Sequence, residues 1–184
     1  MLAYVFWHWR RQEIARDAYE ALQRRFHAAL EAAPPRGFLR SRSLAIAGVP
    51  WAAAGGEAYE DWYLVDGSAA LDPLNAAAVS ASRQVPHDAA AAAAHGGTAG
   101  LYSLRLGAAG EMPSTATWFA KPAGMGYPAL FATLEPLVQA EGAALWGRQM
   151  TLGPTPEFCL HSRRAVALPA ALTPSPIACR PLWP

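Results

Sequence analysis

The sequence predicts an α+β fold in which two related units are joined in one chain. Strand-like and helix-like patterns alternate in the order βαββαβ over residues 1–107, and a strand, helix, strand order returns over residues 115–162. The chain has 184 residues, of which 53% are hydrophobic and 16% are charged, so it is long enough to bury a substantial core. We therefore expect a complete unit at residues 1–108 and a second, truncated unit at residues 109–184, packed together as one compact domain.

The first strand is predicted at residues 2–10 (LAYVFWHWR), which are rich in aromatic residues and apolar on both faces for most of their length. This pattern is typical of a central strand. Because side chains alternate along a strand, one face carries Tyr4, Phe6, His8 and Arg10, and the other carries Ala3, Val5, Trp7 and Trp9.

A helix is predicted at residues 12–33, where apolar residues recur at intervals of three and four. Pro34 and Pro35 end it. Its outward face is expected to carry the polar side chains Arg16, Glu20, Gln23, Arg24 and His27.

Three further strands are predicted in the first unit, at residues 37–47, 59–66 and 100–106, with a loose hairpin loop at 54–56. Asp61 and Tyr63 share one face of the third strand.

Two helical segments are predicted between the third and fourth strands. Asp72 is expected to cap a helix that runs from Pro73 towards Arg83, because proline is tolerated at the first helical position. An alanine-rich segment then begins at residue 86 and is expected to end at Gly96 and Gly97.

The βαββαβ order is that of a ferredoxin-like unit, in which the first strand lies between the third and the fourth. His8 and Arg10 would then have Asp61, Tyr63 and Arg105 as cross-strand neighbours.

The second unit is expected to contain a strand at residues 115–121, a helix at 128–150 and a strand at 157–162. The tail that follows is rich in proline and has no room for a second helix. Because proline cannot donate to a central strand ladder, we expect this tail to supply an edge strand.

This plan resembles the dimeric α+β barrel group, in which two ferredoxin-like units pack sheet against sheet. The resemblance rests on the element order and on the segments TWFAKPAGMGYPALFATLEPL and LWGRQM. That group includes cofactor-independent monooxygenases, small-molecule isomerases and haem-binding enzymes. The resemblance therefore implies a fold and leaves the chemistry open.

A catalytic hypothesis centres on His8, whose imidazole could act as a general base near neutral pH. Asp61 would lie beside it, and Arg10 or Arg105 together with Tyr63 would stabilise developing oxyanion charge. The resulting activity would be cofactor-independent oxygenation or isomerisation of a small apolar or aromatic molecule. In the alternative interpretation the same groups form an ion-pair network in a non-catalytic binding or structural domain.

A ligand-binding set is also predicted. Arg40 and Arg42 could hold a carboxylate or enolate oxygen through the guanidinium fork. Trp7, Trp9 and Trp118 could line an apolar pocket. A haem-binding barrel, the second alternative, would need an open axial position opposite a histidine.

The segment EFCLH places Glu157, Cys159 and His161 at alternate positions of one predicted strand face. Side chains two residues apart on a strand stand too far apart for a Cys–His dyad. No second cluster at metal-ligand spacing accompanies them, so a small core cysteine is favoured and no metal is expected, although His161 is kept as a ligand-binding candidate.

Composition disfavours several classes of protein. The formal charge is +1 and the basic residues are dispersed, which disfavours nucleic acid as a partner. Cys159 and Cys179 are too few for a disulfide framework, and no apolar run approaches membrane-spanning length. We expect a soluble, cytoplasmic protein without a cofactor that acts on a small organic ligand as a monomer or homodimer.

Overall fold

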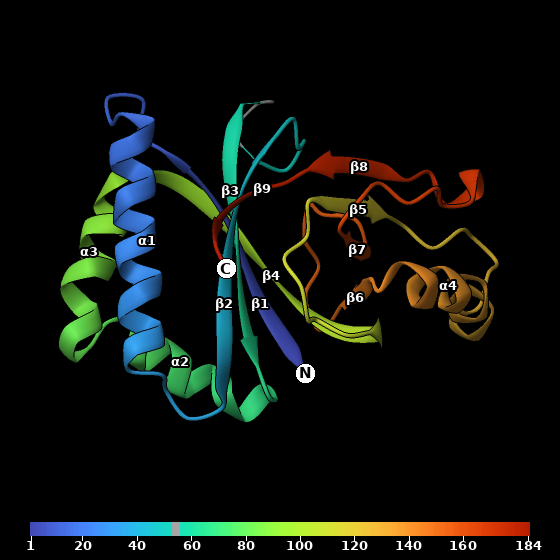
Figure 1. Cartoon of the computed structure of the whole chain (residues 1–184), viewed down its shortest axis with the longest axis horizontal. Coiled ribbons are helices and arrows are strands. Elements are labelled where there is room, and N and C mark those ends of the chain that lie inside the picture. Colours follow the sequence, from blue (N-terminus) through green and yellow to red (C-terminus); the bar gives the residue numbers. More distant parts are fainter. Residues whose placement is uncertain (53–55) are drawn as a thin grey trace.

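A computed structural model describes residues 1–52 and 56–184 and contains one antiparallel sheet rolled into a nearly closed barrel (Figure 1). In the described residues, nine strands follow the order β8-β5-β7-β6-β4-β1-β3-β2-β9. The hairpin loop predicted at 54–56 lies mostly outside the described residues. Helices cover the two outer faces, so that the layers run helix, sheet, sheet, helix across the molecule.

The first half has the predicted ferredoxin-like topology, with strand order β4-β1-β3-β2. Its strands are β1 (Leu2–Arg10), β2 (Phe38–Ala47), β3 (Glu57–Val65) and β4 (Ala94–Gly107). Its helices are α1 (Arg16–Ala32), α2 (Leu71–Ala78) and α3 (Gln84–Ala93), and two 3-10 turns, η2 (Ser68–Ala70) and η3 (Ala81–Arg83), flank α2.

Several predicted boundaries in this half are wrong. Ala70, and not Asp72, is the N-cap of α2, which ends at Ala78. Gly96 and Gly97 lie inside β4 and do not end a helix. A Cβ at Gly97 would lie 2.7 Å from the Trp7 carbonyl oxygen, so the glycine is needed where β4 runs closely against β1.

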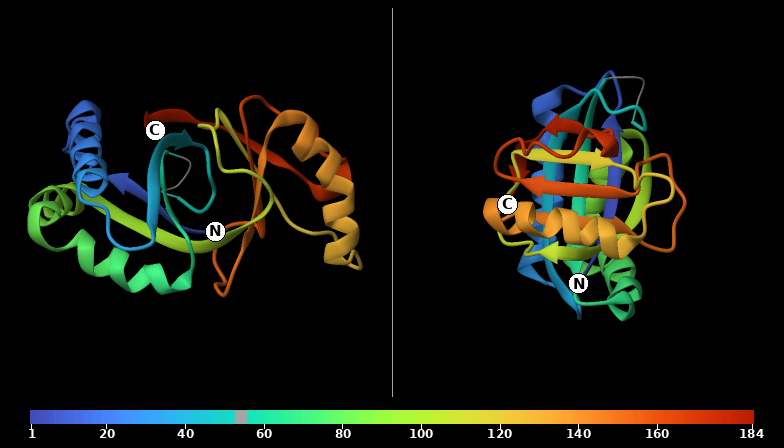
Figure 2. Two further views of the ribbon diagram at one scale, coloured as in Figure 1. Left: turned by 60° about the horizontal axis from the view of Figure 1, so that its bottom comes forward. Right: turned by 90° about the vertical axis from the view of Figure 1, so that its right-hand side faces the viewer.

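The second half repeats the same order, β8-β5-β7-β6, with one helix. Its elements are β5 (Thr115–Phe119), α4 (Tyr127–Glu141), β6 (Ala144–Arg148), β7 (Phe158–Ser162), a 3-10 turn η4 (Ala170–Leu172) and β8 (Ser175–Ala178). Figure 2 (right) shows α4 across the outer face of this half, whose strands run across those of the first half.

The single long helix predicted at residues 128–150 is wrong. Gly142 adopts a left-handed conformation with φ of 56° and ends α4. The apolar residues that follow it form β6, which pairs with both β4 and β7.

The proline-rich tail closes the sheet. β8 pairs with β5, and β9 (Arg180–Trp183) pairs with β2 at the opposite end of the strand order. Only Cys179 separates β8 from β9, and its N–H donates to the Ser114 carbonyl at 2.8 Å. The prediction that the tail supplies an edge strand is confirmed, because β8 and β9 lie at the two ends of the strand order, and the tail also links these two edges (Figure 1).

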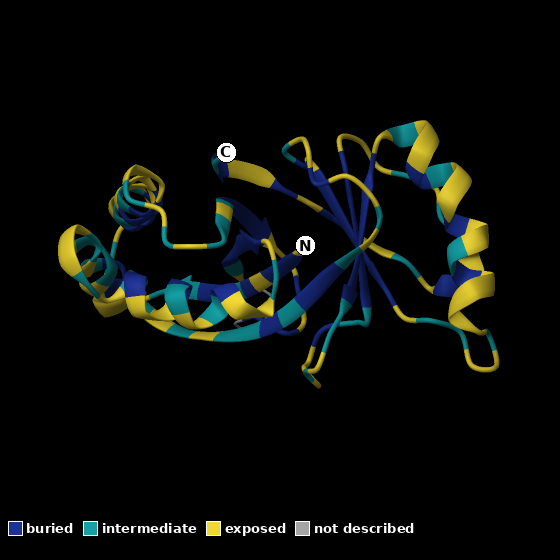
Figure 3. Cartoon of the chain, turned by 90° about the horizontal axis from the view of Figure 1, so that it is seen from below, coloured by how far each residue is buried: buried dark blue, intermediate teal, exposed yellow. Residues whose placement is uncertain are grey.

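Burial divides the core into an interior layer and two outer layers (Figure 3). The barrel interior is filled by large aromatic side chains that belong to one cluster: Trp7, Trp51, Trp62, Trp118, Trp146 and Tyr102. Separate clusters lie beneath α1–α3 and beneath α4. No helix in the described part of the chain is both long and apolar enough to cross a membrane.

Candidate functional site

Because side chains alternate along a strand, two of the predicted site residues, His8 and Asp61, lie in the layer between the first half of the sheet and its helices. His8 pairs in register with Tyr59, and Phe6 pairs with Asp61, so that His8 and Asp61 are diagonal neighbours on adjacent strands. The other face of β1 carries Trp7 into the barrel interior, as predicted.

The Asp61 carboxylate is shared by two imidazoles. Its Oδ2 atom lies 3.1 Å from His8 Nε2 and 3.2 Å from His27 Nε2. The Tyr63 hydroxyl donates to the same oxygen at 3.1 Å. His8, His27 and Asp61 are at most 1% exposed.

Each imidazole is held at its other nitrogen by a hydroxyl group. His8 Nδ1 lies 2.6 Å from the Tyr19 hydroxyl, and His27 Nδ1 lies 2.7 Å from the Ser41 hydroxyl. We call Tyr19, His8, Asp61, Tyr63, His27 and Ser41 the histidine–aspartate network. Such a chain of buried polar groups is uncommon in a layer between helices and a sheet, where apolar side chains predominate.

Aromatic rings enclose the network. His8 stacks on Tyr59 with ring centroids 5.5 Å apart, and His27 stacks on Tyr63 at the same separation. The side chain of Trp183 in the C-terminal strand β9 stacks on the other side of His27 at 6.3 Å. The tail thus helps to enclose the site.

Electrostatics favour a charged Asp61. Burial alone would raise the pKa of this carboxyl group, but His27 and His8 together hold it well below its ordinary value. Burial, reinforced by the Asp61 charge, raises the pKa of both Tyr19 and Tyr63. The network therefore combines a carboxylate with neutral phenols, and an imidazolium formed at His8 would be stabilised directly by Asp61.

Sequence reasoning missed His27. It assigned Glu20, Gln23 and His27 to the outward face of α1, whereas all three are buried, at 4% exposure or less. The buried face of α1 is wide because α3 and β9 pack beside it as well as the sheet. One usable signal was the seven-residue spacing from Glu20 to His27, which places both on the same stripe of the helix.

The predicted arginines do not join the network. Arg10 pairs with Glu57 at 3.4 Å, and Arg40 donates to the Gly110 carbonyl at 3.1 Å. Arg42 is buried and donates to the Ala109 carbonyl at 2.8 Å, and burial lowers its pKa to about 10. Arg105 lies towards the opposite end of β4 from the strand positions that face His8.

A second polar group lies inside the barrel, around Glu60. This carboxylate accepts hydrogen bonds from the indole N–H groups of Trp7, at 2.7 Å, and Trp62. His161 Nε2 lies 3.8 Å from Glu60, and burial lowers the pKa of His161. Trp118 belongs to the same interior cluster, and Trp9 packs against it.

Cys159 and His161 share the interior face of β7 as predicted, but Glu157 does not join them. β7 begins at Phe158, and Glu157 accepts a hydrogen bond from the Tyr127 hydroxyl at 2.6 Å on the exposed side of the molecule. Cys159 is a core residue, and burial raises the pKa of its thiol.

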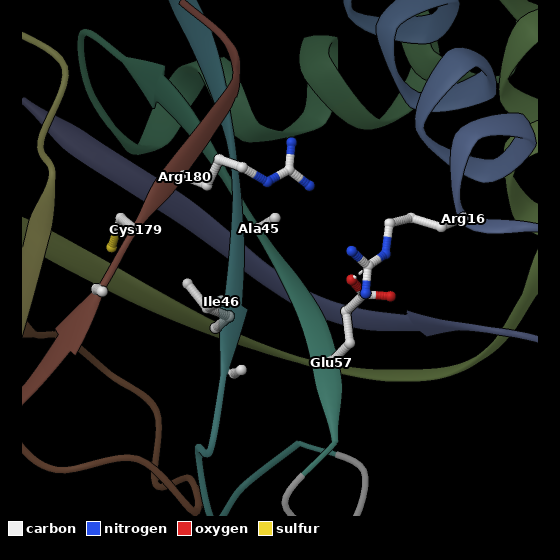
Figure 4. A pocket seen from close by; sticks show the side chains of 8 residues that line it. Arg16, Ala45, Ile46, Glu57, Cys179 and Arg180 are labelled. Carbon is white, nitrogen blue, oxygen red and sulfur yellow. Dashed lines mark ion pairs between the residues drawn. The ribbon is translucent and has the colours of Figure 1, made fainter.

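A pocket of about 310 Å³ opens near the network, where β2 and the tail diverge (Figure 4). Arg16 and Glu57 form an ion pair at 2.6 Å on one side of it, and Arg180 lies on the other. Arg180 also pairs with Glu20, which accepts a hydrogen bond from Tyr59 at 3.3 Å. Tyr59 and Glu20 therefore stand between this pocket and His8.

A metal ion or a haem group would need suitably arranged ligand side chains among the described residues. No group of three or more His, Cys, Asp or Glu side chains in these parts of the chain is arranged to hold a metal ion. His8 and His27 each have Nδ1 against a hydroxyl group and Nε2 within ion-pair distance of Asp61, and no histidine lines either described pocket. Neither described pocket therefore offers a histidine as an axial haem ligand.

Comparisons with known proteins identify the fold. No protein-family model matches the chain, and neither does any curated protein sequence. The crystal structure described as a "putative monooxygenase" from Fusobacterium nucleatum superposes with a TM-score of 0.67 at 8% identity, covering 99% of this chain and 92% of that chain.

Two further structures are more distant. An anthrone oxidase-like protein has a TM-score of 0.48 at 12% identity, covering 89% of this chain and 73% of that one. Chlorite dismutase from Candidatus Nitrospira defluvii has a TM-score of 0.40 at 10% identity, covering 89% of this chain and 77% of that one. Together with the strand order, the first superposition shows that the chain has the dimeric α+β barrel fold, with both ferredoxin-like units in one polypeptide.

Proposed function

We propose that the protein is a small-molecule enzyme that removes a proton from an aromatic, enolisable substrate at the histidine–aspartate network, the first step of a cofactor-independent oxygenation or isomerisation. The observation that supports this proposal is the buried Asp61 carboxylate held between two imidazoles. A purely structural layer would bury aliphatic side chains at lower cost than two histidines and an aspartate.

His8 is the proposed base. Asp61 faces Nε2 and would hold the ring with its proton there, which leaves Nδ1 as the acceptor. The Tyr19 hydroxyl lies against Nδ1 of His8. Tyr19 would therefore give its hydroxyl proton to His8 while its oxygen takes a proton from the substrate. The imidazolium that results is stabilised by the Asp61 charge.

Substrate would approach from the pocket beside Arg16 and Arg180. Access to Tyr19 requires that the Tyr59 ring and the Glu20–Arg180 pair move aside. The guanidinium groups of Arg16 and Arg180 could then face the developing enolate oxygen of the substrate. In oxygenation, the substrate carbanion is oxidised by dioxygen. In isomerisation, the proton returns to a different carbon.

The test uses 1,8-dihydroxyanthrone, an aromatic ketone whose acidic C–H bond gives a carbanion that reacts with dioxygen. Oxygen consumption and anthraquinone formation are followed for the unaltered protein and for His8→Gln. We expect the variant to lose the protein-dependent rate by about a hundredfold or more, the usual contribution of a general base. His87→Gln, at a partly exposed histidine outside the network, is the matched control and should keep the full rate.

Equal rates for the unaltered protein and His8→Gln, with both folded by circular dichroism, would contradict the proposal. A non-catalytic domain is the second candidate, and one observation favours it: no member of the network lines either described pocket. Exchange of the probe's acidic proton in deuterated buffer without oxygen separates the proton-transfer step from the later reaction with dioxygen.

A further inference from the structure

A second pocket, of about 220 Å³, lies in the other half of the molecule, between the start of α4 and the strands β6 and β7. It is lined by seven residues: Arg105, Tyr127, Phe131, Gly147, Arg148, Glu157 and Phe158. None of these residues belongs to the histidine–aspartate network. The pocket can therefore be considered independently of the proposed reaction.

Three aromatic rings form its apolar wall. Tyr127 and Phe131 stack with ring centroids 6.2 Å apart and an interplanar angle of 26°. Phe158 meets Tyr127 and Phe131 edge-on at 6.3 and 6.2 Å. Rings in these orientations offer both a face and an edge to another aromatic ring, the arrangement in which aromatic pairs attract one another.

The absence of a side chain at Gly147 leaves space in the wall of the pocket. A Cβ at this position would lie 3.0 Å from Arg105 Nε and 3.1 Å from Phe158 Cε1. A larger residue would require the Arg105 side chain or the Phe158 ring to shift by a few tenths of an ångström. The glycine thus lets the exposed Arg105 side chain and the buried Phe158 ring approach the same backbone position in the pocket wall.

The charges around the pocket are mainly positive. Arg148 lines it and donates to the Thr155 carbonyl at 2.7 Å, and Lys121 Nζ lies 5.3 Å from the centre of the Tyr127 ring. Glu157, the one carboxylate of the lining, accepts from the Tyr127 hydroxyl at 2.6 Å. In the part of the chain that the structure describes, the Arg105 guanidinium has neither a hydrogen bond nor an ion pair.

We propose that this pocket binds a small aromatic carboxylate. The ring of the ligand would pack against Phe131 and Phe158, and its carboxylate would be held by the Arg105 guanidinium, which can donate two parallel hydrogen bonds. α4 begins at Tyr127 on the rim, without a side-chain cap, so the positive end of its dipole adds to the attraction for an anion. The volume suits one substituted benzene ring.

The test is a ¹⁹F NMR titration with 4-fluorobenzoate and, separately, with its neutral analogue 4-fluorobenzamide. We expect the unaltered protein to bind the carboxylate about tenfold more tightly than the amide, because a charge-assisted bidentate contact is made only with the carboxylate. Arg105→Gln should abolish this difference. Added salt should also reduce it, since the pocket is open to solvent.

Two further variants make the result specific. Phe131→Ala should weaken binding of both probes, because it removes part of the aromatic wall. Arg25→Gln removes an exposed cation on α1, in the other half, and should leave both affinities unchanged. Thermal unfolding of each variant confirms that it is folded.

The proposal is overturned if 4-fluorobenzoate does not bind, if the two probes bind equally well, or if Arg105→Gln binds the carboxylate as tightly as the unaltered protein. Each of these outcomes is independent of oxygen consumption at His8. Failure of this proposal therefore leaves the proposed function standing, and the reverse also holds.

Discussion

Asp61 is the residue on which the histidine–aspartate network depends, because two imidazoles and one phenol all face the same carboxylate oxygen. Removing its charge leaves His8 and His27 buried without their shared partner. We expect Asp61→Asn to lower the free energy of unfolding by about 3 kcal/mol, the scale seen when one member of a buried pair is lost. Urea unfolding at neutral pH measures this difference, and Asp88→Asn, at an exposed carboxylate, should cost almost nothing.

Acid should destabilise the protein through the same residue. Folding holds the pKa of Asp61 well below its ordinary value of about 3.9, so the unfolded chain takes up this proton first as the pH falls. The stabilisation is complete above the ordinary pKa and is lost as the pH falls below it. Asp61→Asn should therefore lose less stability than the unaltered protein between about pH 5 and pH 3. Parallel pH profiles for the two proteins would show that Asp61 is not held in its charged form.

Part of the site could be predicted at this scale. Alternation along β1 and β3 was enough to place His8, Asp61 and Tyr63 on one face and Trp7 on the other. His27 could not be placed in the same way, because the width of the buried face of α1 depends on β9, a segment far away in the sequence. The partners of the arginines depend on loop carbonyls, which local patterns do not locate.

At the scale of single elements, the predicted strands were accurate where a pattern ended at a clear break and inaccurate where it did not. The first strand was predicted with its observed ends because the apolar run stops at Arg10. The strand β6 was missed because its apolar residues resume directly after Glu141 and Gly142, and a glycine and one charged residue alone did not mark the end of the helix. The conformation of Gly142 was the one local signal of that change.

Two glycines with positive φ lie at the ends of α4 and β4, and replacing each by alanine tests how much the glycine contributes to stability there. Gly142 ends α4, and a Cβ there would have nothing within 4 Å. Gly142→Ala should therefore lower the free energy of unfolding by only about 1 kcal/mol, the cost of a left-handed backbone conformation for alanine. Gly107 ends β4 with φ of 75°, and a Cβ there would lie 2.0 Å from the Ala143 carbonyl oxygen. Gly107→Ala should therefore cost at least about 3 kcal/mol, because the β4–β6 pairing must shift.

Denaturant midpoints of the two glycine variants, measured with the unaltered protein, give the comparison directly. If both variants lost the same free energy of unfolding, the left-handed backbone conformation alone would explain the loss of stability. In that case the close approach between Gly107 and Ala143 would not constrain the junction of the two halves.

At the scale of the whole molecule, the two ferredoxin-like halves meet along two seams that are related by the repeat. The fourth strand of the first half, β4, pairs with the second strand of the second half, β6. At the other seam, β9 extends the fourth strand of the second half and pairs with β2, the second strand of the first. Each half thus completes the sheet of the other, and one continuous tail forms the second seam.

The tail should consequently control the stability of the barrel as a whole. β9 contributes the buried Leu182, the Trp183 ring that stacks on His27, and the Arg180 side chain that pairs with Glu20. Deleting residues 180–184 removes these contacts and the hydrogen bonds to β2, and it opens the interior tryptophan cluster along one side. We expect the truncated protein to lose its cooperative thermal transition or to unfold at least about 10 °C lower, with tryptophan emission shifted to longer wavelength.

Deleting Pro184 alone is the matched control, since this exposed residue lies beyond the last paired strand position, and it should leave the transition unchanged. The deletion of 180–184 also discriminates between two models of the fold. If the second seam holds the halves together, both lose stability as one cooperative unit. If instead the tryptophan emission shifts while the unfolding temperature stays the same, the β4–β6 seam alone is sufficient to hold the barrel, and the tail acts only as a cover over its interior and over His27.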